Sequence, residues 1–201
     1  VAVNVDPGFP GYRKDRIEDH LREHGFACHF ENTDCSAIID AKLRPGSSYC
    51  AFCARLRRGV LYTVADRLGC NKLALGHHLD DFIETLLLNQ FYIGTLAAMS
   101  PRLLADNGRH TVIRPLVYVE EADIIEFARR NDFPVVCCSC PVVGAADQKR
   151  QRMKQLISDL AKENPQLRRS LIGALGNVQP RHLMDPRLTP FAPLGKGPDM
   201  V

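Results

Sequence analysis

The sequence has 201 residues, of which 45% are hydrophobic and 24% are charged, enough to fill the core of one ordinary domain and keep it soluble. This composition excludes disordered and fibrous chains, and no apolar run approaches the ~18 residues of a membrane span. The formal net charge of +3 is too small to indicate a nucleic-acid partner by itself. Because no signal peptide follows Val1, we expect a cytoplasmic protein with no membrane partner.

The first third of the chain alternates between strand and helix. Residues 1–5 are largely apolar and are followed by Asp, Pro and Gly, which predicts a buried strand that ends in a loop. In residues 14–24, Ile17 and Leu21 lie four apart among charges, which predicts a short amphipathic helix. Residues 26–31 are expected to form the next strand. Residues 40–49 are expected to be a loop that leads to the first cysteine pair.

The same alternation continues to residue 136. The apolar spacing predicts a helix from the cysteine pair to residue 68, and then a strand at residues 72–75. Asp80 is expected to cap the following helix, because aspartate is a preferred N-cap residue. Three further elements complete the series: a strand at 111–117, a helix at 120–130 and an extended segment at 133–136.

This alternation predicts an α/β fold, in which helices flank a parallel sheet. Beyond Asp147 the texture changes to a helix at 148–162, a second helical stretch to about residue 175, and a proline-rich tail. We therefore expect an α/β domain over residues 1–140 and a basic helical extension with its tail over residues 141–201.

The extension is the basic side of the molecule. Residues 141–201 contain ten Lys and Arg against five Asp and Glu, so they carry +5 and the remainder carries −2. Alternation with apolar residues predicts one helix face for the domain and a cationic face for RNA phosphates; the alternative is a face that only keeps the protein soluble. The candidate RNA-binding residues are Lys149, Arg150, Arg152, Lys154, Arg168 and Arg169.

The eight cysteines are too unevenly placed for a disulfide scaffold, and their spacing favours a metal site. Cys50 and Cys53 form a C-x-x-C pair where a loop meets a helix. Three interpretations compete: a redox dithiol, half of a zinc site, or part of an iron–sulfur site. A redox dithiol is expected directly after a strand, whereas a loop precedes this pair. Further ligands are available downstream, at Cys137, Cys138 and Cys140.

Residues 75–81 read Leu-Gly-His-His-Leu-Asp-Asp and lie where a strand meets a helix, the edge at which α/β sheets bind ligands. Asp80 and Asp81 can hold a magnesium ion, and Gly76 allows close approach of a nucleotide to the backbone. The alternative is a capping Asp80 beside a solvated Asp81 and two structural histidines.

Taken together, four motifs resemble the tRNA 2-thiocytidine synthetase group of the PP-loop, or N-type ATP pyrophosphatase, superfamily. They are the Cys50 to Gly59 segment, the Leu75 to Asn89 segment, Ile113-Arg-Pro-Leu116 and Asn177-Val-Gln-Pro-Arg-His-Leu183. The resemblance covers most of residues 1–185, in family order. It implies an adenine nucleotide alpha hydrolase-like fold and an ATP-dependent tRNA thiolase that modifies a cytidine of the anticodon loop, position 32 in the family.

The resemblance also implies cofactors and partners. The cofactors are a [4Fe-4S] cluster, ATP and Mg²⁺. ATP adenylates the cytosine oxygen at C2, and sulfur carried by the cluster then replaces it. The partners are tRNA and a cysteine desulfurase or other sulfur donor, with a homodimer left open.

Site residues follow from the same resemblance. Cys50, Cys53 and Cys140 would hold the cluster with one iron left open, with Cys138 as the substitute for Cys140. Asp80 and Asp81 would position magnesium and pyrophosphate. The remaining residues divide into a nucleotide-lining group, Val3, Asn4, Gly76 and His77, and a phosphate-binding group, Arg57, Arg58 and Arg114.

Two departures from the family pattern stand out. The phosphate-binding Ser-Gly-Gly-Lys-Asp-Ser loop is absent from these 201 residues, and residues 1–6 resemble the second strand of the fold, so we expect an N-terminally truncated domain that binds ATP poorly by itself. A late cysteine pair is also reduced to Cys140, with Val143 in the second place. Two alternatives remain open: a different PP-loop thiolase or lysidine-type ligase, and a non-catalytic metal-binding module that contacts tRNA or protein.

Overall fold

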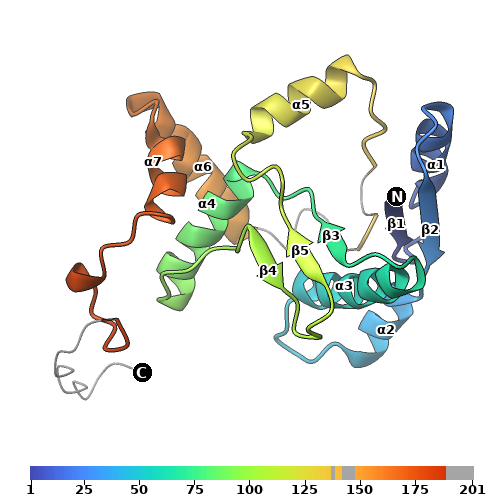
Figure 1. The fold of residues 1–201 in the computed structure, drawn as a ribbon, viewed down its shortest axis with the longest axis horizontal. Coiled ribbons are helices and arrows are strands. Elements are labelled where there is room, and N and C mark those ends of the chain that lie inside the picture. The colour runs from blue at the N-terminus through green and yellow to red at the C-terminus, as the bar shows by residue number, and fades with distance from the viewer. Residues whose placement is uncertain (137–138, 142–147, 189–201) are drawn as a thin grey trace.

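The computed structural model describes residues 1–136, 139–141 and 148–188 (Figure 1). Helices and strands alternate through the first part of the chain, and two helices follow. In chain order the elements are β1 (Ala2–Asp6), α1 (Lys14–Glu23), β2 (Cys28–Asn32), α2 (Cys35–Lys42), α3 (Tyr49–Arg67), β3 (Lys72–Ala74), α4 (Leu79–Leu88), β4 (Arg102–Leu104), β5 (Thr111–Ile113), α5 (Glu121–Arg130), α6 (Gln148–Glu163) and α7 (Leu167–Ala174). A π-helical turn, Asn89–Ile93, extends α4, and a 3₁₀ turn, Pro180–His182, follows α7.

The strands form two sheets. β1 pairs in parallel with β2, from Ala2 opposite Cys28 to Asp6 opposite Asn32. β3 pairs in parallel with β5, and β4 lies antiparallel on the other side of β5. The α/β class with parallel pairing and flanking helices is therefore confirmed. β4 was not predicted, because a strand of three exposed residues is too short to show a period of two.

Three element boundaries differ from the sequence-based expectation. The loop expected at 40–49 is shorter, since α2 reaches Lys42; buried Cys35 and Ile39 lie one turn apart on this helix. The strand expected at 111–117 ends at Ile113, because Pro115 has no N–H to donate to a ladder. The segment 133–136 joins no strand in the described structure.

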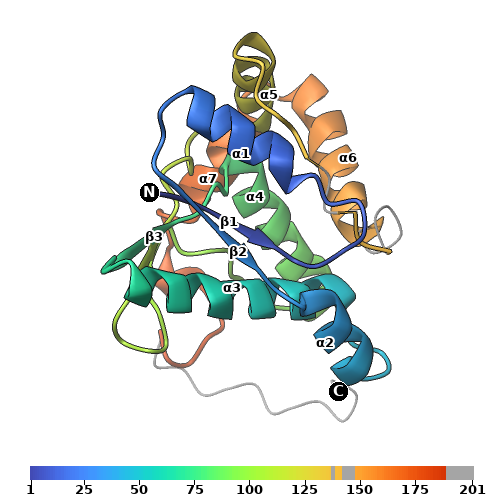
Figure 2. The ribbon, with the colours of Figure 1, turned by 90° about the vertical axis from the view of Figure 1, so that its right-hand side faces the viewer.

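Helix α3 packs against both sheets, through β1 and β3 (Figure 2). Its buried residues are Val64 and Ala65. The next two side chains make polar contacts on opposite sides: the Asp66 carboxylate contacts His110 Nε2 at 3.2 Å, just before β5, and the Arg67 guanidinium pairs with Glu31 of β2 at 3.1 Å. One helix thus sets the spacing between the two sheets.

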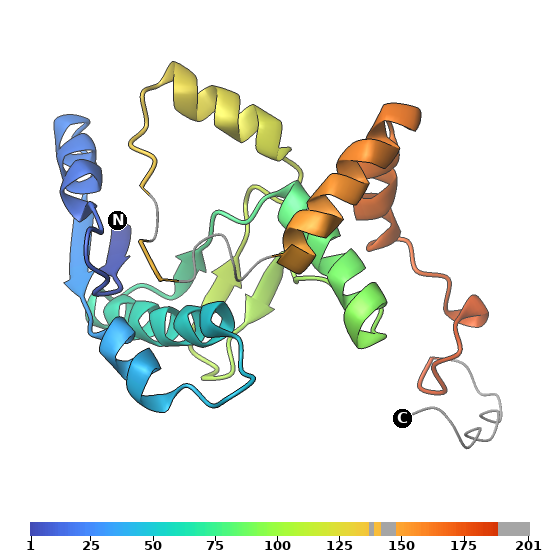
Figure 3. The same cartoon turned by 180° about the vertical axis from the view of Figure 1, so that it is seen from behind.

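The main hydrophobic cluster joins α4 to α6, which lie side by side in Figures 1 and 3. Its buried members are Leu79, Ile83, Leu87, Met153 and Ile157, and leucines of α7 pack around them. The apolar face expected on α6 is therefore present. The cluster lies across the expected boundary at residue 140, so α6 and α7 share a core with the α/β part. Within the described residues, no helix has the length and apolar character needed to cross a membrane.

We predict that Ile157→Ala lowers the free energy of unfolding by about 2 to 5 kcal/mol, because it removes buried methyl and methylene groups and leaves a cavity between α6 and α4. Leu160→Ala, on the same helix but 42% exposed, is the control and should change it by less than about 0.5 kcal/mol. Urea titration followed by circular dichroism measures both values. Equal effects of the two substitutions would contradict the packing of α6 on α4.

Candidate functional site

The parallel neighbours β3 and β5 bring three predicted site residues to one place. Gly76 and His77 follow β3, and Arg114 follows β5 directly. The Arg114 Nε–H donates to His77 Nδ1 at 3.3 Å, and its guanidinium also donates to the Ser100 carbonyl. The carboxyl ends of parallel strands meet at one sheet edge, so two segments 37 residues apart in sequence form one corner.

This corner is cationic and partly buried. Arg114 is 9% exposed, and its pKa is lowered by burial and then by the charge of Arg58 on α3. The pKa of His77 is also lowered, chiefly by burial and then by Arg114. The lowered pKa favours neutral His77, which accepts a hydrogen bond from Arg114, and the charge of Arg58 acts on both residues. Anionic oxygen atoms, such as those of a phosphate, are the natural ligands of such a corner.

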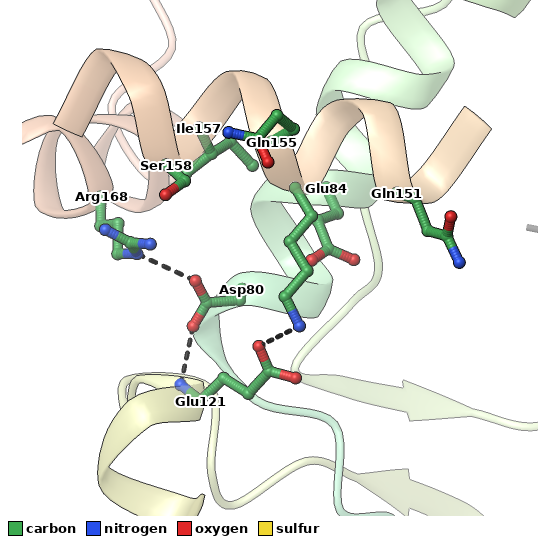
Figure 4. Close-up of a pocket in the computed structure, with 9 residues that line it drawn as sticks. Asp80, Glu84, Glu121, Gln151, Gln155, Ile157, Ser158 and Arg168 are labelled. Atoms are coloured by element: carbon green, nitrogen blue, oxygen red, sulfur yellow. Dashed lines mark hydrogen bonds and ion pairs between the residues drawn. The ribbon is translucent and has the colours of Figure 1, made fainter. Parts of the chain in front are cut away.

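Asp80 has a different neighbourhood from the one expected. Its Oδ2 accepts from the backbone N–H of Glu121 at 2.7 Å, and its Oδ1 accepts from Arg168 Nε at 2.9 Å (Figure 4). Glu121 is the first residue of α5, so Asp80 caps α5. The expected cap of α4 by Asp80 is wrong: the α4 start is supported by Asp81, whose Oδ2 accepts from the His78 N–H at 3.0 Å.

Asp81 shares a cation with a second acid that the sequence analysis did not identify. Arg150 of α6 contacts Asp81 Oδ1 at 3.2 Å and Glu84 Oε2 at 3.0 Å. Glu84 is only 4% exposed, and burial raises its pKa while Arg150 opposes that rise. Helical spacing could have identified it, because Glu84 follows Asp80 by one turn on α4.

Half of the predicted RNA-binding cations therefore face carboxylates inside the molecule. Arg150 and Arg168 contact the acids of α4, and Lys154 contacts Glu121 at 2.5 Å. Figure 4 shows acids and Arg168 around a cavity of about 300 Å³ between α4, α6 and α7. The other three differ: Lys149 lies 4.7 Å from the Tyr92 ring centroid, and Arg152 and Arg169 are exposed.

Val3 and Asn4 were expected to line the nucleotide site, but they lie on β1. This strand pairs with β2 in one sheet, whereas His77 follows β3 of the other sheet. The Asn4 amide donates to the Tyr12 hydroxyl at 2.9 Å, and its Oδ1 is buried with no hydrogen-bond partner in the described structure. No described contact brings these two residues to the His77 corner.

The cysteine pair lies on the first turn of α3, where Cys50 is exposed and Cys53 is partly buried. Burial is the main cause that raises the pKa of the Cys53 thiol, and the charge of Arg57, one turn further along α3, opposes the rise. The charges of Cys35, Cys140 and Cys50 raise this pKa further. Cys140 is thus brought near the pair from a remote segment. Cys138, the substitute ligand, lies outside the described residues.

The surroundings of Tyr49 bear on which kind of group these thiols can bind. Its hydroxyl is buried with no hydrogen-bond partner in the described structure, and its ring packs 6.2 Å from that of Phe9. Burial and the nearby charges of Asp40, Cys140, Cys53 and Cys50 raise its pKa. An unused O–H donor beside three thiols fits a group that brings further sulfur acceptors. The sequence signal was present, because Tyr49 precedes Cys50.

In the described residues, no three His, Cys, Asp or Glu side chains are grouped to hold a metal ion. Thiolates that bind a cubane cluster are held apart by the cluster's own width, so they lie further from one another than the ligands of one ion. The thiols of Cys50, Cys53 and Cys140 are ligands of the type that both a zinc ion and an iron–sulfur cluster take.

Comparison with known proteins supports the same class of site. The PP-loop domain family matches residues 17–136. A tRNA-cytidine(32) 2-sulfurtransferase of Syntrophotalea carbinolica is 72% identical over 95% of this chain and 74% of its own length. Its counterpart in Geobacter sulfurreducens is 70% identical over 92% of this chain and 72% of its length.

A solved structure shares the fold. The U34-tRNA thiolase NcsA from Methanococcus maripaludis, determined with its [4Fe-4S] cluster, aligns with a TM-score of 0.67 and 20% identity over 89% of this chain and 62% of its own. Fold and site thus define a PP-loop protein. At the identities found, the chain belongs to the tRNA-cytidine(32) 2-sulfurtransferase family.

The lowered pKa of His77 predicts a pH dependence of stability. Below the usual value of 6.5 the unfolded chain binds a proton that the folded chain does not, so the free energy of unfolding falls as pH decreases from 6.5 toward the folded pKa. Asp81 opposes this effect, whereas Arg114, Arg150 and Arg58 strengthen it.

His77→Asn keeps an acceptor for Arg114 but cannot titrate in this range. Urea unfolding of both proteins at pH 7.5 and below 6 should give a smaller acid loss for the variant. An identical loss in the two proteins would contradict a neutral, half-buried His77.

Proposed function

We propose that this protein catalyses ATP-dependent thiolation of cytidine 32 of tRNA, with a [4Fe-4S] cluster held by Cys50, Cys53 and Cys140. One observation carries the proposal: a single helix, α3, presents the cysteine pair at its start and Arg58 to the His77 and Arg114 corner. Cys50 and Arg58 are eight residues apart, or about 12 Å along a helix. The names of the relatives supply the substrate.

The cysteine end would hold sulfur for transfer. When bound, the cluster supplies an iron that can carry the sulfur atom which enters the base. Cys50, Cys53 and Cys140 would be its thiolate ligands, and the Tyr49 hydroxyl would donate to sulfur. Because burial raises the pKa of Cys53, its binding as a thiolate releases a proton and is favoured by higher pH.

The arginine end would bind the phosphates of ATP. Attack by the cytosine O2 on the α-phosphorus forms an O–P bond, releases pyrophosphate and makes O2 a leaving group. Sulfur then bonds to C2 and AMP departs with that oxygen. Arg58 and Arg114 would stabilise the charge on the phosphate oxygens, in a site where burial strengthens that interaction.

Of the two aspartates, Asp81 is the better candidate for a magnesium-bound phosphate. Both oxygens of each carboxylate already accept hydrogen bonds, but the Asp81 side chain is 22% exposed and that of Asp80 only 8%. Magnesium, the sulfur donor and a homodimer stay predictions.

We predict that protein reconstituted with iron and sulfide without oxygen shows the broad iron–sulfur absorbance, and that Cys50→Ser, Cys53→Ser and Cys140→Ser each abolish it. Cys70→Ser is the matched control, because the Cys70 thiol contacts the Leu68 carbonyl at 3.7 Å, away from the pair. Metal analysis that finds one zinc per chain and no acid-labile sulfide would refute the cluster and favour a binding module.

We also predict that Tyr49→Phe still assembles the cluster but lowers its reduction potential, because a hydrogen bond to sulfur stabilises the more negative, reduced state. Potentiometric titration followed by electron paramagnetic resonance measures the shift. Tyr62→Phe, which removes a hydroxyl from the middle of α3, is the control. A potential unchanged by Tyr49→Phe would show that its hydroxyl does not reach the cluster.

A further inference from the structure

A basic cavity of about 590 Å³ lies where α2 ends and α3 begins. Three cationic side chains, Lys42, Arg44 and Arg55, line it together with the hydroxyls of Ser47 and Ser48. No carboxylate is among its lining residues. The cavity therefore has hydrogen-bond donors and positive charge but no acid to balance them.

The three cations also form no ion pair in the part of the chain that the structure describes. The cations of α6 and α7 that face α4 differ, because Arg150 and Arg168 already neutralise buried acids there. A cation paired with a buried carboxylate is less available to a phosphate, because withdrawing it leaves that carboxylate uncompensated. The cations of the basic cavity are under no such constraint.

The basic cavity adjoins the cysteine pair. Ser48 is the N-cap of α3 and accepts from the Ala51 N–H at 3.3 Å, and both serines are within six residues of Cys50 and Cys53. One helical turn advances only about 5.4 Å, so a ligand in the cavity lies within about two turns of the thiols. A nucleotide whose base receives sulfur near the cysteine pair therefore brings its own backbone phosphates close to the basic cavity.

We propose that the basic cavity binds backbone phosphates of the RNA strand whose cytidine is thiolated. The identity of that RNA rests on the proposed function. The volume exceeds what one phosphate needs, and three separate cations suit successive phosphates of a strand better than one compact anion. ATP is assigned to the Arg58 and Arg114 corner, so loss of the cavity cations should spare ATP binding.

The test measures the affinity of residues 1–201 for an unmodified anticodon stem-loop RNA with cytidine at position 32, by fluorescence anisotropy over a range of KCl concentrations. The variant combines Lys42→Gln, Arg44→Gln and Arg55→Gln. Each phosphate contact contributes roughly 0.7 to the slope of log K against log salt for single strands, so the slope should fall in magnitude by about two units. An unchanged slope would overturn the proposal.

Two matched control variants each lose three positive charges at other positions. The first combines Arg22→Gln, Arg130→Gln and Lys162→Gln, exposed cations in local helical pairs, and should leave the slope unchanged. A fall equal to that of the cavity variant would mean a general charge effect and would overturn the proposal. The second combines the exposed extension cations, Lys149→Gln, Arg152→Gln and Arg169→Gln. A fall in this variant together with an unchanged cavity variant would move the RNA site to the extension.

Iron–sulfur absorbance of the cavity variant separates the two proposals, because Lys42, Arg44 and Arg55 are not cluster ligands. A normal cluster with a reduced slope supports the cavity. If neither the unmutated protein nor the cavity variant binds a cluster, and the slope of the variant still falls, the cavity is supported and the proposed chemistry is refuted. If the cluster forms and the slope does not fall, only the cavity is refuted.

Discussion

The position of helix α3 between the two sheets is the constraint on which the candidate site depends. Val64 and Ala65 are buried, and Asp66 and Arg67 tie the same turn to His110 and Glu31, so the second half of the helix is fixed on both sides. A helix transmits that position rigidly toward its start. The places of Arg58 and of the cysteine pair therefore follow from packing that lies two to four turns away.

The same logic explains the ion pairs of α4. This helix places two aspartates in its first turn and Glu84 one turn later, beside the residues that it contributes to the main hydrophobic cluster. Packing α6 on that cluster brings the acids out of water, and Arg150 and Arg168 supply the compensating charge. Buried ion pairs add little net stability, but removal of one partner is costly, so these pairs restrict how α6 and α7 can dock. The Lys and Arg side chains of residues 141–201 that face inward, such as Arg150 and Arg168, thus serve folding.

Local pattern was enough to predict the alternation of elements and the meeting of His77 with Arg114. Helical spacing marked α1, α3, α4 and α6, and parallel strands bring their carboxyl ends together whatever the intervening sequence. Contacts between remote segments could not be predicted in this way. Asp80 has the local features of a cap for α4, yet its partners Glu121 and Arg168 are 41 and 88 residues away. The surroundings of the unpartnered Tyr49 hydroxyl likewise include distant groups such as Phe9, 40 residues earlier.

The distribution of positive charge along α3 is suited to the reaction that the family catalyses. RNA phosphates, the phosphates of ATP and a thiolate-bound cluster are all anionic, so they repel one another when brought within a few ångströms. Arg57 lies near Cys53, and Arg58 lies near the His77 and Arg114 corner. The remaining cations, Lys42, Arg44 and Arg55, lie around the start of the helix. In the proposed arrangement each anion would meet its own cation, and the rigid helix would set the distance between them. Bringing sulfur and an activated base together therefore requires the spacing of these cations as much as the cysteines themselves.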